Sequence, residues 1–179
     1  MKSRLLSILF LVLCLLFAFV FGAYRGWQKD YAAVEETRIS LTDQISTQAE
    51  TASNILTVAF RHLDRDDESI LALTGIRDTL RSHAALADKA AAAKQLSVQA
   101  EALLDKLAPL ESVQKDDRDN MYVSSMLPRM LRESTAPAVK DAYNAAAADF
   151  NDRFEKNAVS AFIAAQLGIH PFEPFGSAE

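Results

Sequence analysis

The sequence is poor in the residues that cross-link small domains or coordinate metals. Its single cysteine, Cys14, excludes a disulfide framework within the chain and a thiolate metal site. The three histidines lie in different segments. His62 and Asp66 are four residues apart, but the helical pattern ends between them. The sequence therefore predicts neither a metal site nor a cofactor.

Motifs of catalysis and nucleic-acid binding are missing as well. There is no glycine-rich phosphate loop, nucleophile elbow or dinucleotide fingerprint. The basic residues are scattered among acids at a net charge of −5, without the basic stripe that nucleic-acid binding requires. We expect a protein that is not an enzyme, has no catalytic residues and does not bind nucleic acid.

Residues that break helices are scarce, with only five glycines and five prolines in 179 residues. Alanine and leucine are abundant, and the strand-like alternation of β-branched and aromatic residues is missing. This composition predicts an all-α fold of long helices.

The most distinctive feature present is an uncharged apolar run, Leu5–Ala23. As a helix it would be about 28 Å long, close to the hydrocarbon thickness of a bilayer. A cleaved signal peptide is the alternative, but a cut after Ala23 would place Phe21 where a small residue is preferred. We expect an uncleaved signal-anchor with the lipid bilayer as partner. The basic and aromatic residues expected at the membrane interface are Lys2, Arg4, Tyr24, Arg25, Trp27 and Lys29.

Apolar periodicity divides the remaining chain into segments. The expected helices are residues 34–63, continuous with the apolar run as a stalk, 67–107, 112–133 with a break at Pro128, and one from Pro137 to Gly168. The methionines of the third helix are expected in the core. The expected organisation is an N-terminal tail and anchor (1–28), a helical domain (29–168) and a Pro/aromatic tail (169–179).

The middle of the second expected helix, Ala84 to Ala93, consists almost entirely of small residues. Small side chains allow close approach of a neighbouring helix, and the same composition could leave a shallow groove.

Several residues in this order resemble the LemA family of bacterial membrane-anchored helical proteins. They are Val34 and Glu36, Gln44 and Ile45, Asn54, Glu68, Thr74 and Arg77, Tyr143-Asn144, Phe150-Asn151, and the ending from Gly168 to Phe175. Thr47 and Gln48 stand where the family has paired arginines. The resemblance implies a transmembrane helix followed by an antiparallel bundle of about four long helices, in the bacterial inner membrane. From the charges around the apolar run, we expect the domain to lie outside the cytoplasm.

Two functional hypotheses follow. The first is a membrane-anchored interaction or scaffold protein whose partner is another envelope protein, with self-association left open. The second is a ligand-sensing or transport-accessory domain with a pocket near the small-residue stretch. In either case, Asn54, Tyr143, Asn144 and Asn151 are expected either to bond neighbouring backbone or to form a polar cluster between helices.

Overall fold

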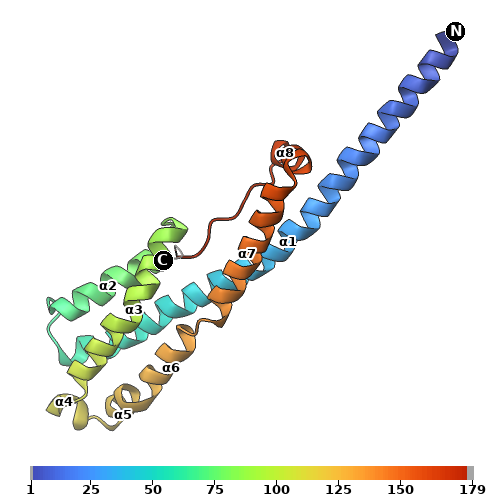
Figure 1. The fold of residues 1–179 in the computed structure, drawn as a ribbon. Coiled ribbons are helices and arrows are strands. Elements are labelled where there is room, and N and C mark those ends of the chain that lie inside the picture. The colour runs from blue at the N-terminus through green and yellow to red at the C-terminus, as the bar shows by residue number, and fades with distance from the viewer. Residues whose placement is uncertain (1, 177–179) are drawn as a thin grey trace. The chain divides into compact units, whose positions relative to one another are not determined.

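The computed structural model describes residues 2–176, with side chains from residue 6 onward. This part of the chain is helical and contains no strand, which confirms the all-α class. The helices are α1 (Lys2–His62), α2 (Glu68–Arg81), α3 (Leu86–Leu107), α4 (Glu111–Gln114), α5 (Asp117–Met121), the π-helix η1 (Tyr122–Met126), α6 (Leu127–Ser134), α7 (Ala138–Lys156) and α8 (Ala158–Gln166) (Figure 1).

The chain forms two compact units. Of the described residues, the first unit comprises 2–38 and 142–174, and the second comprises 39–141 and 175–176. Helices α1 and α7 each contribute to both units, because each unit boundary falls within a helix.

Helix α1 is continuous from the apolar run into the stalk, as the sequence predicts. Between Leu6 and Phe21 its large apolar side chains are exposed, whereas beyond residue 38 only one face is buried. That buried face is Leu41, Ile45, Ala52, Ile55, Leu56 and Ala59, at the spacing expected from the sequence. One helix therefore changes from apolar on all sides to amphipathic.

The expected second helix is wrong in one respect, because it is two helices. Ser82 adopts an extended backbone, with φ −73° and ψ 174°. Its hydroxyl donates to the Thr79 carbonyl at 2.8 Å and accepts from the Ala84 amide at 3.1 Å. These bonds satisfy backbone groups at the end of α2 and allow the chain to reverse into α3.

The hairpin of α2 and α3 supplies much of the second unit's core. Asp67 caps α2 by accepting from the Ser69 amide at 3.0 Å, in agreement with the expected helix start. The buried side chains are Ile70, Leu73, Ile76 and Leu80 of α2 and Leu96, Ala100, Leu103 and Leu107 of α3.

The expected helix 112–133 is wrong at its start, where Lys115 and Asp116 separate α4 from α5. Pro128 interrupts the rest of this segment, as expected, and the interruption takes the form of a π-helix. The Leu127 amide bonds to the Tyr122 carbonyl, one residue further back than in an α-helix. Proline cannot donate to the carbonyl four residues earlier, and its ring crowds that carbonyl, so a wider turn precedes it. The expected burial of the methionines is wrong for Met121 and Met126, which are 50% and 40% exposed.

In the first unit, the single helix expected from Pro137 to Gly168 is wrong, because Asn157 divides it into α7 and α8. Gly168 follows the end of the second of these helices, as the sequence predicts. The Ile169 amide donates to the Ala164 carbonyl at 3.0 Å, and the Gly168 amide to the Ala165 carbonyl at 3.1 Å. This pair of bonds is the Schellman motif, which places the residue after the C-cap in the left-handed region. Gly168 accordingly has a φ of +86°.

Glycine to alanine substitutions at two positions should have opposite effects. Gly168→Ala should lower the free energy of unfolding by about 1 kcal/mol, because a Cβ is strained at positive φ. Gly75→Ala, inside α2 with open space where the new Cβ would lie, should raise it by about 0.5–1 kcal/mol. Thermal unfolding of the full chain in detergent, followed by circular dichroism, measures both. Equal shifts of the same sign would contradict the left-handed backbone at Gly168 and the ordinary helical position of Gly75.

Candidate functional site

Helix α1 is, among the described residues, the one helix long and apolar enough to cross a membrane. Of the predicted interface residues, Lys2 and Arg4 have side chains outside the described range. Tyr24 is half-buried, and its hydroxyl accepts from Gln28 at 2.9 Å. Arg25 and Lys29 are exposed, which leaves their charges available at the end of the apolar run.

Trp27 differs from the other expected interface residues because its side chain is buried. Its ring packs edge to face on Phe150 and Phe154, with centroids 5.5 Å and 5.1 Å apart. Tyr31 and Phe172 extend this aromatic cluster, with centroids 4.7 Å apart. Trp27 therefore joins α1 to α7 within the first unit and does not present its ring to headgroups.

Two of the predicted polar residues hold the C-terminal segment on α7. The Tyr143 hydroxyl donates to the Glu173 carbonyl at 2.6 Å, and burial raises the pKa of that hydroxyl. The Asn151 amide donates to the Phe172 carbonyl at 2.8 Å and accepts from the Phe172 amide at 2.9 Å. Both side chains therefore bond backbone groups of an adjacent segment, which is one of the two roles expected from the sequence.

The other two predicted polar residues are Asn144 and Asn54. Asn144 is half-buried on α7 and makes an interaction of its own, and Asn54 is exposed on the second unit's part of α1. A polar cluster that includes all four residues stays a prediction.

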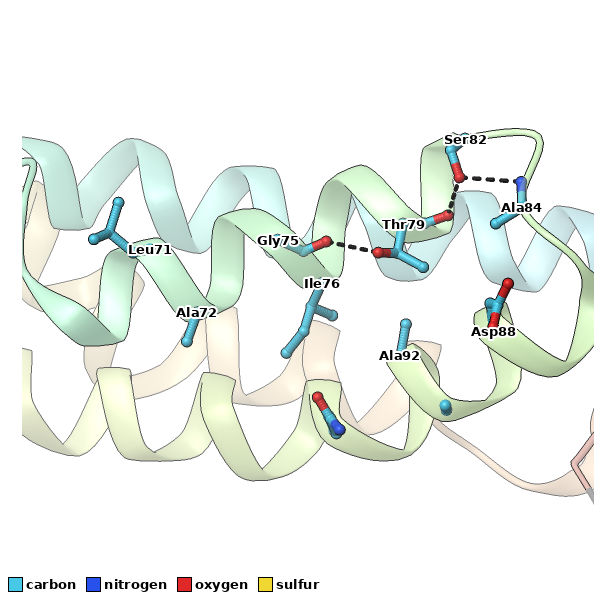
Figure 2. Close-up of a pocket in the computed structure, with 11 residues that line it drawn as sticks. Leu71, Ala72, Gly75, Ile76, Thr79, Ser82, Ala84, Asp88 and Ala92 are labelled. Atoms are coloured by element: carbon cyan, nitrogen blue, oxygen red, sulfur yellow. Dashed lines mark hydrogen bonds between the residues drawn. The ribbon is translucent and has the colours of Figure 1, made fainter.

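The second unit has an open groove of about 640 Å³ between α2 and α3 (Figure 2). It coincides with the small-residue stretch, which contributes Ala84, Asp88, Ala91 and Ala92 to its wall. From α2 come apolar side chains such as Leu71 together with the Thr79 hydroxyl. The volume is within the range of small-molecule sites, although such sites usually enclose their ligand more completely.

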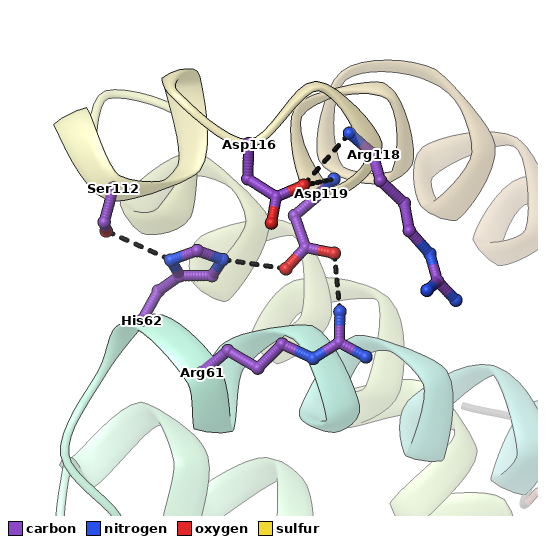
Figure 3. Close-up of polar contacts among 6 residues, drawn as sticks. All are labelled: Arg61, His62, Ser112, Asp116, Arg118 and Asp119. Atoms are coloured by element: carbon purple, nitrogen blue, oxygen red, sulfur yellow. Dashed lines mark hydrogen bonds and ion pairs between the residues drawn. The ribbon is translucent and has the colours of Figure 1, made fainter.

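A polar cluster that the sequence did not reveal lies at the C-terminal end of α1 (Figure 3). The carboxylate of Asp119 is 1% exposed and accepts from Arg61 Nη1 at 2.7 Å and from His62 Nε2 at 2.9 Å. On the other side of the His62 ring, Nδ1 lies 3.0 Å from the Ser112 hydroxyl. With the Nε2 proton directed to Asp119, Nδ1 accepts the serine proton.

Local structure positions this buried carboxylate. Asp116 caps α5 by accepting from the amides of Arg118 and Asp119, both at 3.0 Å. Burial raises the pKa of Asp119, but the hydrogen bonds from His62 and Arg61 outweigh it, so the pKa lies below its usual range. Asp119 therefore stays ionised at neutral pH.

The order serine, histidine, aspartate is also that of a hydrolase relay, in which the aspartate stabilises the imidazolium that forms. Here Arg61 pairs with the same carboxylate and offsets that charge. Ser112 is exposed on the four-residue helix α4. The geometry better suits a clamp that fixes the end of α1 against α4 and α5. Within the described residues, no group of histidine, cysteine, aspartate and glutamate side chains is arranged to hold a metal ion.

Comparisons with known proteins give no relative for this chain: no family model, curated protein or solved structure matches it.

Replacing Asp119 tests the clamp. Asp119→Asn should lower the free energy of unfolding by about 1.5–3 kcal/mol, because it removes a buried charged acceptor shared by two donors. The exposed Asp105→Asn is the matched control and should change it by less than about 0.5 kcal/mol. Thermal unfolding in detergent measures both, and equal effects would contradict the clamp.

The clamp should also weaken in acid. The pKa of Asp119 in the folded chain lies below its ordinary value of 3.8, so the unfolded chain takes up the proton first as the pH falls. The stability that the carboxylate contributes is present above that ordinary pKa and is lost as the pH falls through the folded pKa. The stability difference between wild type and Asp119→Asn should therefore shrink below about pH 4. A difference that grows as the pH falls from about 4 to about 2 would contradict this sign.

Proposed function

We propose that this chain is a single-pass membrane protein whose helical part acts as a non-enzymatic interaction or scaffold module of the bacterial envelope. One observation carries the membrane attachment. Thirteen large apolar side chains between Leu6 and Phe21 are exposed on α1. At about 1.5 kcal/mol each, their transfer into hydrocarbon gains about 20 kcal/mol. That exceeds the roughly 5–15 kcal/mol that keeps a typical domain folded.

Helix continuity supports an anchor that is retained. Cleavage after Ala23 would cut α1 four residues before Trp27, at the edge of the aromatic cluster. The resemblance to the LemA family belongs to this proposal, as do an antiparallel bundle of about four long helices and an inner-membrane location with the folded part outside. The scaffold role is favoured over hydrolysis because Arg61 offsets the charge of the Ser112–His62–Asp119 cluster, whose serine lies exposed on a four-residue helix.

Membrane retention can be measured on the full chain expressed in bacteria. The protein should stay in the membrane pellet after alkaline carbonate extraction and should keep the mass of the whole sequence. Leu13→Arg combined with Phe17→Arg should release it, since each arginine costs about 2.5–3.5 kcal/mol at the centre of a membrane helix. Ser46→Arg, on the exposed face of the stalk, is the matched control and should be retained. A mature protein that begins beyond Ala23 would contradict the anchor.

The interaction role is tested by affinity capture from solubilised membranes after cross-linking in intact cells. We expect at least one envelope protein, or a second copy of the chain, to be enriched over the same capture from cells lacking the tagged protein. Capture with no enrichment counts against the scaffold role. Protease treatment of spheroplasts then determines the side of the membrane, and degradation of the folded part in intact spheroplasts is the expected result.

The groove between α2 and α3 favours a second candidate function, the binding of a small ligand. If the groove is a binding site, the purified chain should bind an apolar fluorescent probe such as anilinonaphthalene sulfonate, and Ala91→Trp should abolish that binding by filling the groove. Val98→Trp, at an exposed position on the same helix that does not line the groove, is the control. Equal probe binding by wild type and both variants would exclude the groove as the site.

A further inference from the structure

Helix α8 has the reverse of the polarity expected for a helix in water. The twelve residues from Ala158 to Ile169 include no charged side chain. Within α8 the small residues Ala161 and Ala164 are buried and Ile163 is half-buried, whereas the large residues Val159 and Phe162 are 70% and 67% exposed; Leu167, which caps the end of the helix, is 50% exposed. Helices in water place their large apolar residues inside and polar residues outside, and an exposed apolar face of this kind marks a contact with another apolar surface.

The contacts of α7 with α1 place the beginning of α8 along α1. Phe150 packs on Tyr31, and four residues later Phe154 packs on Trp27, four residues earlier in α1. The ion pair of Arg153 with Asp30, at 2.9 Å, agrees with this antiparallel register. In the same register, the residue four positions after Phe154 is Ala158, the first residue of α8. It lies level with the residue four positions before Trp27, which is Ala23, the last residue of the apolar run. The chain therefore leaves α7 at the level where α1 becomes apolar on all sides.

At that level the chain changes direction. Asn157 interrupts the helix, and α8 does not continue the axis of α7 (Figure 1). The exposed arginine Arg25 and the half-buried Tyr24 belong to the same level of α1, and both residue types favour the headgroup region of a bilayer. α8 lacks the charged face of most interfacial helices, but its large exposed apolar side chains lie at the depth where they can enter the boundary between headgroups and acyl chains, and membrane binding grows with the apolar area buried there.

We propose that α8 is a second membrane contact, an interfacial helix whose Val159, Phe162 and Leu167 enter the bilayer beside the anchor. This inference rests on the proposed membrane attachment of the apolar run. The occupant of the exposed face is lipid, because the face begins where the apolar run ends and carries no charge that a polar protein surface would pair with. Membrane attachment through the apolar run does not require it, so the two proposals can fail separately.

The test uses the full chain with Cys14→Ser, so that a single introduced cysteine can carry a nitroxide spin label. Labels at Val159→Cys and Phe162→Cys are compared in phosphatidylcholine vesicles by their collision rates with oxygen and with a water-soluble nickel complex. Leu13→Cys in the apolar run is the lipid control, and Ala148→Cys on the exposed face of α7 is the water control. Unchanged emission from the single tryptophan, Trp27, shows that each labelled variant keeps the aromatic cluster.

We expect the labels at positions 159 and 162 to favour oxygen over nickel and to lie shallower than the label at position 13. Nickel accessibility at position 162 equal to that at position 148 would overturn the α8 proposal and leave the anchor intact. Low accessibility to both reagents would indicate a protein contact and would also overturn it. Nickel accessibility at position 13 would overturn the anchor and the α8 proposal together.

Discussion

The hydrogen-bonded backbone of α1 continues from Lys2 to His62 while the polarity of its surface changes along the way. Only a helix allows this, because it satisfies its interior backbone groups within the segment in either lipid or water. Elements of each unit contact α1. In the first unit α7 packs on it through Trp27, and in the second unit the clamp at Asp119 fixes its C-terminal end.

The two units are held together internally by different kinds of contact. Aromatic rings dominate around Trp27 and Phe150, where three further rings lie within about 6 Å of one or both, as expected for side chains that gain most from dense packing. At the other end of α1, a buried carboxylate receives two donors, which specify one geometry more strictly than apolar contacts do. The polar backbone contacts from Tyr143 and Asn151 add the C-terminal segment to the aromatic cluster.

The sequence predicts the structure best where the burial of one helix face determines how the segment folds. The continuity of α1 and its buried stripe follow from the spacing of Leu41, Ile45 and Ile55. The turn at Ser82 was missed because alanine and leucine favour a helix on both sides, and a serine side chain supplies the stop without glycine or proline. The clamp was missed because periodicity identifies a face but not its partner, and His62 and Asp119 are 57 residues apart. Likewise, the sequence places Trp27 at an aromatic border without showing that its ring is covered by α7.

The close spacing of the apolar run and the aromatic cluster has a consequence for bilayer thickness. Trp27 follows the end of the run by only four residues, about 6 Å along the helix, and its ring is packed between Phe150 and Phe154. If α1 spans the bilayer as proposed, it cannot slide inward in a thicker membrane without drawing this cluster into the headgroups. Tilting would only shorten its span, so the responses left are local thinning of the bilayer, snorkelling of the flanking side chains or association of several chains. Hydrophobic mismatch would then act directly on the packing of the first unit and favour membranes whose thickness matches the run.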